Sequence, residues 1–207
     1  MVTSIDLVYP FTGRWLVHNS PADTVPSHGT PLFATSFAID FVPVDEDGVT
    51  APFTPLSLVR TQPPDDFPRF GRTVLSPVAG TVLAVHDSEE DHSAYRGLPS
   101  LCYALTQRHR VRAGWNAPAG NHVLIRHATG VVVALCHLQS SSAVVRPAQE
   151  VRAGDVLGRC GNSGNSTEPH LHVQAVDTGD IAAAQAVPLS FGGRLPHNGE
   201  IVVVPDR

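Results

Sequence analysis

The clearest periodicity in the chain is an alternation of polar and apolar residues over positions 170–175. The polar positions are His170, His172 and Gln174, and apolar residues stand between and after them. A period of two predicts a half-buried β-strand. Side chains two residues apart on a strand share one face, about 6.5–7 Å apart. We therefore expect both imidazoles to point to the same place, directly after the glycine-rich loop 161–169.

Shorter segments of the same texture predict further strands separated by turns. The 18 prolines, 17 glycines and only 16% charged residues fit many short strands better than helices. The expected strands cover residues 5–8, 14–18, 37–42, 121–126 and 131–138, two segments of 74–85 hinged at 77–80, and a final pair within 187–207 that includes 201–204. The pattern predicts a mainly β protein.

Two stretches interrupt this texture. Residues 44–71 are rich in proline and aspartate and are expected to form a surface excursion. In residues 86–119, apolar side chains recur at helical spacing, at Leu98, Leu101, Ala104 and Leu105. We expect a small helical insertion there, within a single domain that spans residues 1–207.

Composition narrows the class of protein. A chain of 207 residues with 42% hydrophobic residues is large enough to bury a core. The net charge of −5 gives no basic footprint, so nucleic acid is not an expected partner. The first residues lack a basic segment followed by an apolar one, and no apolar run approaches the ~20 residues of a membrane span. By sequence alone we expect a cytoplasmic protein without a signal peptide or membrane span.

Three cysteines, Cys102, Cys136 and Cys160, cannot form a complete set of disulfides. Each stands in an apolar or glycine-rich context, so we expect buried thiols in a reducing compartment rather than a redox or metal-binding role.

Three further positions could carry chemistry. Asp40 lies within an apolar strand, where a carboxylate is costly to bury unless it is paired, hydrogen-bonded or bound to a metal. The alternative is an aspartate that reaches solvent at the strand end. His137 ends a β-branched run and could equally be a core histidine, and His28 stands in a loop. His170 and His172 supply two imidazoles on one strand face. Two imidazoles plus a carboxylate are typical of a catalytic zinc site.

The sequence excludes three other kinds of functional site. The glycine-rich loop lacks the Gly-Lys-Ser/Thr ending of a phosphate-binding loop, and no His-Glu-x-x-His occurs. The Gly-x-Ser-x-Gly elbow of serine hydrolases is also missing.

Five motifs, taken in order, resemble the M23 metallopeptidases, which are the LytM and lysostaphin-type endopeptidases. They are Phe-Ala-Ile-Asp-Phe around Asp40, Ser-Pro-Val-Ala-Gly-Thr-Val at 76–82, Gly-Asn-His-Val-Leu-Ile at 120–125, His137-Leu138, and the run from Gly154 through Gly-Asn-Ser-Gly to His-Leu-His at 172. The resemblance covers residues 25–190. It implies an antiparallel β-sheet or sandwich of the duplicated hybrid motif type, with a groove over the main sheet.

The resemblance also implies roles for individual residues. Asp40 and His172 correspond to zinc ligands, and His137 and His170 to the catalytic pair beside the metal. The family pattern has a third ligand, a histidine, four residues before the aspartate, and this chain has Ser36 there. We take His28, twelve residues before Asp40, as the replacement ligand for a single Zn²⁺.

The function implied by the resemblance is zinc-dependent hydrolysis of peptide bonds in bacterial cell-wall peptidoglycan cross-links, which would place the protein in the cell envelope or outside the cell. One alternative is a catalytically inactive relative that binds wall peptides or regulates another hydrolase. Another is a phosphocarrier of the sugar-phosphotransferase IIA type, which the Phe-Ala-Ile-Asp carboxylate and the His-Leu-His pair fit poorly. A biotinyl or lipoyl carrier shares the Pro-Val-x-Gly-x-Val turn, but no lysine stands in the required hairpin.

Overall fold

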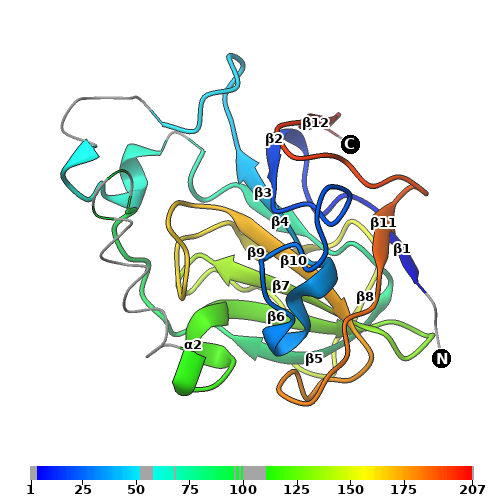
Figure 1. Cartoon of the computed structure of the whole chain (residues 1–207). Helices are drawn as coiled ribbons and strands as arrows, with labels where there is room; N and C mark the ends of the chain where they lie inside the picture. The colour runs from blue at the N-terminus through cyan, green and yellow to red at the C-terminus, as the bar shows by residue number, and fades with distance from the viewer. Residues whose placement is uncertain are drawn as a thin grey trace.

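The computed structural model describes residues 4–51, 58–67, 69–95, 97, 99 and 111–206. Its centre is an eight-stranded sheet in which every neighbouring pair of strands is antiparallel (Figure 1). The strands, in spatial order, are β12 (Ile201–Val204), β2 (Gly13–His18), β3 (Ile39–Pro43), β10 (Leu171–Val176), β7 (Val132–Leu138), β6 (Asn121–Arg126), β5 (Gly80–His86) and β8 (Glu150–Val151). The expected mainly β, antiparallel architecture is confirmed.

Two small sheets and three short helical segments complete the described elements. β1 (Ile5–Leu7) pairs in parallel with β11 (Leu189–Phe191), and β4 (Thr73–Leu75) pairs antiparallel with β9 (Val156–Arg159). The helical segments are the 3₁₀ helices η1 (Leu32–Phe37) and η3 (Pro64–Asp66) and the short α2 (Asn116–Ala119). η1 crosses in front of the sheet in the view of Figure 1.

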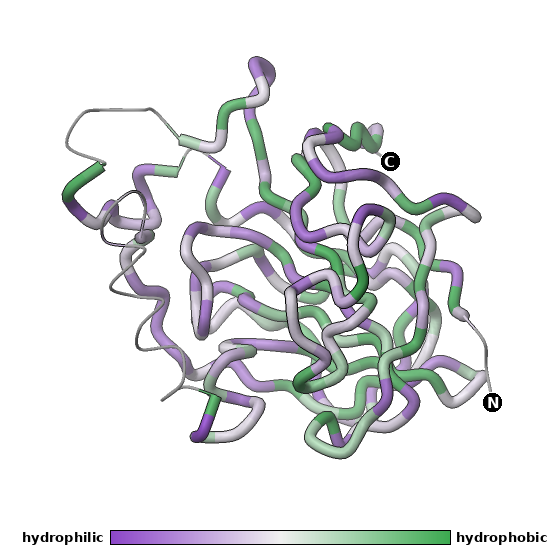
Figure 2. Tube along the Cα trace, in the orientation of Figure 1, coloured by the Kyte–Doolittle hydropathy of each residue, from purple (hydrophilic) through white to green (hydrophobic). Residues whose placement is uncertain are grey.

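The two faces of the large sheet bury different kinds of side chain. One face carries the main hydrophobic core, to which β10 contributes Leu171, Val173 and Ala175. The other carries a smaller apolar cluster at the far end of β7 and polar residues nearer the middle. Green, hydrophobic segments follow the central strands in Figure 2, and purple ones lie mostly in loops. The period of two in β10 therefore separates core residues from polar residues, as expected.

Three details of the strand predictions are wrong. β10 begins at Leu171, so His170 precedes the strand, and all six of its residues are buried, which makes it a fully buried rather than a half-buried strand. β10 is central, with β3 and β7 on either side. The strands expected to pair within 187–207 do not pair with each other, because β11 joins β1 and β12 joins β2.

The structure describes parts of the two stretches, 44–71 and 86–119, that interrupt the strand pattern. The helical spacing at Leu98, Leu101, Ala104 and Leu105 lies outside the described residues, and α2 is the described helix of that insertion. The excursion at 44–71 is not purely superficial, since Ala51 and Phe67 form a small buried cluster with Ala94.

Cys136 and Cys160 are free and buried, as expected, while Cys102 is outside the described residues. Among the helices of the described part of the chain, none has the length and hydrophobicity that a membrane crossing requires.

Candidate metal centre

A single row of residues crosses six strands of the sheet on its polar face. Directly opposite one another in the strand register are His18 and Asp40, Asp40 and His172, His172 and Cys136, Cys136 and His122, and His122 and His86. Five of these six residues have side chains that titrate as carboxyl or imidazole groups. The register of the sheet therefore brings residues from β2, β3, β10, β7, β6 and β5 into line.

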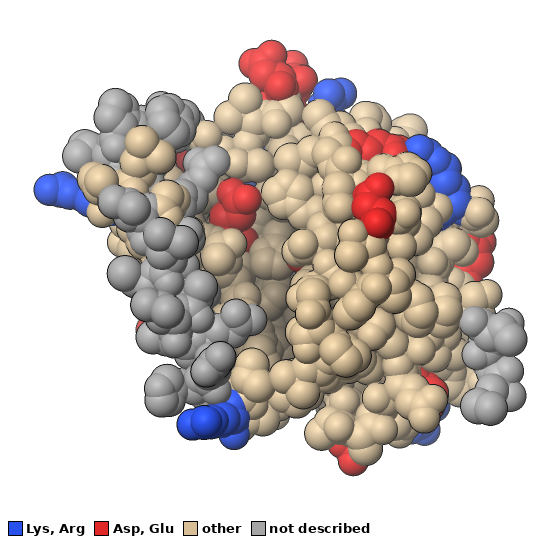
Figure 3. Space-filling view, in the orientation of Figure 1, with Lys and Arg blue, Asp and Glu red and all other residues tan. Residues whose placement is uncertain are grey.

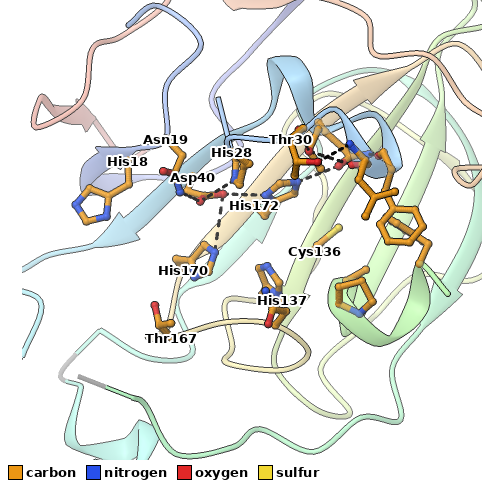
Figure 4. Close-up of a pocket in the computed structure, with 18 of the residues that line it drawn as sticks. His18, Asn19, His28, Thr30, Asp40, Cys136, His137, Thr167, His170 and His172 are labelled. Carbon is orange, nitrogen blue, oxygen red and sulfur yellow. Dashed lines mark hydrogen bonds and ion pairs between the residues drawn. The ribbon is translucent and has the colours of Figure 1, made fainter. Parts of the chain in front are cut away.

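Asp40 is the centre of this row. Its Oδ1 lies 2.8 Å from His172 Nδ1, and its Oδ2 lies 3.0 Å from His28 Nε2. Asn19 Nδ2 donates to the same Oδ2 over 2.7 Å. His28, Asp40 and His172 each offer a ligand atom, and these atoms lie within 4.8 Å of one another. Figure 4 shows the three side chains pointing toward one another.

His28 reaches this site from the loop that precedes η1. Its ring contacts that of His172 edge-on, with the ring centroids 4.9 Å apart. Ser36, at the position that the family pattern gives to a histidine, lies in η1 and is not among the described residues that line the cavity. The structure thus brings His28, and not residue 36, to the carboxylate.

The electrostatics of the trio favour a positive partner. Burial by itself would raise the pKa of Asp40, but the attraction of the His28 and His170 imidazoles and the hydrogen bond from His172 outweigh it and hold that pKa well below 3.8. Burial opposes protonation of His28, yet the neighbouring Asp40 carboxylate raises the His28 pKa above 6.5. Asp40 is therefore a buried carboxylate anion that attracts cations.

His137 comes to the site through a β-bulge. The register between β6 and β7 shifts so that Asn121 and His122 face Leu138 and Cys136, which leaves His137 as the extra residue. His137 has φ 61°, in the left-handed region that non-glycine residues seldom adopt. A bulge re-aims the side chain that it carries. Cys136 and His137 consequently both line the cavity, while Leu138 returns to the core.

The bulge predicts an unusual order of stability for two variants of His137. Alanine at this position retains the left-handed strain, whereas glycine adopts φ > 0 at little cost. We expect His137→Gly to be more stable than His137→Ala by about 1 kcal/mol in urea unfolding. The opposite order, which is usual within strands, would contradict the bulge.

His137 and His170 form a second pair beside the trio, with their ring centroids 4.6 Å apart. His137 Nδ1 donates to the carbonyl oxygen of Ser163 over 2.9 Å, and His170 Nδ1 donates to that of Glu168 over 2.8 Å. Carbonyl oxygens only accept, so each Nδ1 carries a hydrogen and each ring turns its Nε2 away from the backbone. His170 Nε2 is 3.8 Å from Asp40 Oδ1. Burial, followed by the neighbouring His170 and His172, holds the His137 pKa well below 6.5.

His122 lies in the same row but beyond Cys136. Its Nδ1 donates to the Gly120 carbonyl over 2.7 Å, and its ring contacts Trp115 and His86 at centroid distances of 4.3 and 5.4 Å. Burial lowers the His122 pKa to about 4. It therefore stays neutral at neutral pH.

This lowered pKa predicts a loss of stability in acid. Between its folded pKa of about 4 and the ordinary 6.5, His122 is protonated in the unfolded chain but not in the folded one. The free energy of unfolding therefore decreases as pH falls through that window. At about 1.4 kcal/mol per pH unit, the loss approaches about 3 kcal/mol at pH 4. Urea unfolding at pH 7 and pH 4.5 measures it. His122→Asn, which keeps a donor for Gly120, should show a smaller pH dependence, and an unchanged one would contradict this assignment.

A cavity of about 280 Å³ is lined by His28, Asp40, His137, His170 and His172 together with further residues. Its lining is polar near Asp40, where His18, Asn19, Thr167 and Glu168 contribute. It is apolar toward α2, where the lining residues are Phe33, Trp115, Pro118 and Ala119. Figure 3 shows this side of the molecule hollowed at its centre. Of the described residues that line the cavity, none is an arginine or a lysine.

The donors fit a zinc ion. Zn²⁺ takes imidazole nitrogens and carboxylate oxygens at ~2.0–2.2 Å in a tetrahedral arrangement, so two ligand atoms on one ion lie about 3.3 Å apart. The Asp40 contacts of 2.8 and 3.0 Å need only a small expansion to reach that spacing. Asp40 also has only imidazole and amide groups around it, so a cation would compensate its buried charge. With three protein ligands, a fourth position stays open.

The sequence did not predict the roles of two residues of this site. Asn19, which binds Asp40, stands in no recognisable motif, and only its place after β2, beside β3, gives it a role. Gln174 was visible as the third polar residue of the 170–175 alternation, but its hydrogen bond to His172 Nε2 over 3.0 Å was not predicted.

Comparison with known proteins finds a family match for the region that contains His137, His170 and His172. Residues 102–184 match the family model for peptidase family M23. DD-carboxypeptidase/endopeptidase Mpg of Neisseria meningitidis is 48% identical over 56 residues, which are 27% of this chain and 12% of that protein. Peptidoglycan DD-endopeptidase ShyC of Vibrio cholerae is 31% identical over 120 residues, 56% of this chain and 26% of that protein. The chain thus spans a small part of these relatives' lengths.

Among solved structures, the catalytic domain of lysostaphin from Staphylococcus simulans aligns with 88% of both chains at 15% identity and a TM-score of 0.43. A similarity this low adds nothing to the assignment, which stands on the sequence matches. Those matches include the 170–175 segment and the loop before it. By them, this chain is similar to peptidase family M23 over residues 102–184.

Proposed function

We propose that this protein is a zinc-dependent endopeptidase that hydrolyses peptide bonds in the cross-links of bacterial peptidoglycan. The observation that supports it most is the convergence of His28, Asp40 and His172 on one point, with two further imidazoles beside it in an open cavity. The printed names of the relatives, a DD-carboxypeptidase/endopeptidase and a peptidoglycan DD-endopeptidase, agree with this substrate class.

In this proposal each residue has a distinct task. His28, Asp40 and His172 would hold a Zn²⁺, which supplies Lewis-acid polarisation of the scissile carbonyl and lowers the pKa of water. His137 and His170 present Nε2 lone pairs to the cavity, because their Nδ1 atoms donate to backbone carbonyls. They are placed to take a proton from the attacking water and to give one to the leaving amine. The low pKa of His137 keeps it neutral, in the form that accepts a proton.

The alternative of an inactive, peptide-binding relative rested on the missing histidine at position 36 and on the lack of a visible secretion signal. His28 Nε2, at 3.0 Å from Asp40, weakens that ground, since a third donor stands at the carboxylate. In an inactive relative, the trio and the pair of His137 and His170 would serve only to bind a peptide, although three of these five residues are buried.

The direct test is to measure zinc content and hydrolysis on the same preparation. We expect close to one zinc per chain after purification in metal-replete buffer, and release of shortened cross-link peptides from purified peptidoglycan, detected by mass spectrometry. A chelator should stop the release and added Zn²⁺ should restore it. A zinc-loaded protein that releases no peptide from any peptidoglycan would reject the enzyme, and a protein without zinc would reject the metal centre as well.

A further inference from the structure

The side chain of Gln174 determines which nitrogen of His172 carries the proton. Gln174 Nε2 donates to the Phe33 carbonyl over 3.1 Å, so the amide oxygen Oε1 must face the other way. Oε1 lies 3.0 Å from His172 Nε2 and can only accept. His172 therefore carries a hydrogen on Nε2, and Nδ1, which lies 2.8 Å from Asp40 Oδ1, is the nitrogen available to a metal.

The hydroxyl of Ser27 likewise determines which nitrogen of His28 carries a hydrogen. Its hydroxyl oxygen lies 2.7 Å from the Ala38 carbonyl, 3.1 Å from that of Thr35 and 3.0 Å from His28 Nδ1. The single hydroxyl hydrogen goes to a carbonyl, because carbonyls cannot donate, and the serine oxygen then accepts from His28 Nδ1. His28 Nε2, which lies 3.0 Å from Asp40 Oδ2, is then the nitrogen available to a metal.

In both rings the nitrogen away from Asp40 is occupied by a hydrogen bond, so the nitrogen beside the carboxylate is the one that can bind a metal. We infer that Ser27 and Gln174 are positioning residues that prepare His28 and His172 as metal ligands by fixing their tautomers and ring orientations. This inference rests on the proposed function. It concerns residues that touch neither the metal nor the substrate, and it explains how a histidine in a loop twelve residues before Asp40 can serve as a ligand.

Ser27 has a further effect on the loop that carries His28. Its three contacts join the loop to the end of η1 at Thr35 and to Ala38, directly before β3, the strand of Asp40. The backbone N–H of Ser27 also donates to the Ser36 carbonyl over 3.0 Å. The hydroxyl thus links the loop histidine to the strand aspartate, and its removal should loosen their relative placement.

The test measures zinc affinity by competition with a chromogenic chelator, so its readout does not depend on catalysis. Loss of a partner that orients a metal-binding histidine typically costs 10–100-fold in affinity. We expect Ser27→Ala and Gln174→Met each to raise the zinc Kd by about 10–100-fold, and Ser27→Thr to remain near wild type because the hydroxyl is kept. The visible absorption spectrum of the Co²⁺-loaded protein should shift in the two weakened variants.

Ser36→Ala is the matched control, since it removes a hydroxyl from the same loop region and should leave the zinc Kd unchanged. Thermal unfolding of the metal-free variants establishes that each is folded, and Gln174→Met serves if Ser27→Ala is not. Wild-type zinc affinity in both Ser27→Ala and Gln174→Met would overturn this inference while leaving the peptidase proposal intact. A wild-type protein that binds no zinc would overturn both.

Discussion

Replacing His172 by alanine is expected to abolish zinc binding and peptide hydrolysis together. His172 is one of three donors around Asp40, and its loss leaves two ligands for the ion and an empty space beside a buried carboxylate. Zinc content after dialysis and release of peptides from peptidoglycan measure the two effects. His127→Ala is the control, because His127 lies in the exposed turn after β6 and bonds only locally to Thr129.

His170→Ala should separate the two effects that His172→Ala combines. His170 lies 3.8 Å from Asp40 and is not one of the three converging donors, so its variant should retain zinc. Hydrolysis should fall by at least about 100-fold, within the range usual for loss of a general acid or base. Undiminished cleavage in either variant would reject the mechanism, and loss of zinc in His170→Ala would reject the division of roles.

The second large effect is expected on stability, at Gly161. A Cβ atom there would lie 2.3 Å from Gln139 N and 2.4 Å from Gln139 Cα, both in the backbone that follows β7. Backbone atoms cannot rotate away, so Gly161→Ala must displace the glycine-rich loop from β7. We expect a loss of about 3 kcal/mol or more in urea unfolding. Hydrolysis should fall as well, because the same loop carries the Ser163 carbonyl that binds His137.

Gly130→Ala separates steric collision from backbone strain. Gly130 has φ +90°, but a Cβ there meets nothing within 4 Å, so only the conformational cost remains. We expect about 1–2 kcal/mol for that variant. Equal losses for Gly161→Ala and Gly130→Ala would show that the loop does not lie against β7 as described.

Much of the sheet could be predicted because its strands have strong local signals. The alternation in 170–175 and the β-branched run in 131–138 depend only on which side chains face the core. They correspond to β10 at 171–176 and β7 at 132–138. Which strands become neighbours is a matter of contacts far apart in the chain. The pairing of β11 with β1 rather than with β12 leaves no trace in either segment, and it could not be inferred from them.

The site was predictable as a set of residues but not as a geometry. Asp40 and His172 are direct register partners, which a strand prediction alone does not give. The direction of His137 depends on a bulge whose extra residue is a histidine, not the glycine that usually signals one. His28 was found through the resemblance and not through a pattern, because a loop residue obeys no periodicity. Gln174 and Ser27 act through hydrogen-bond direction, which residue spacing does not encode.

The separation of core and cavity onto opposite faces of one sheet has an evolutionary consequence. Substitutions among the imidazoles of the polar face remove no side chain from the large core beneath β10, β7 and β3. Descendants of such a protein can therefore lose their chemistry and keep their architecture. The same arrangement lets a lineage change the loop that supplies the third donor while the strands that hold Asp40 and His172 stay paired.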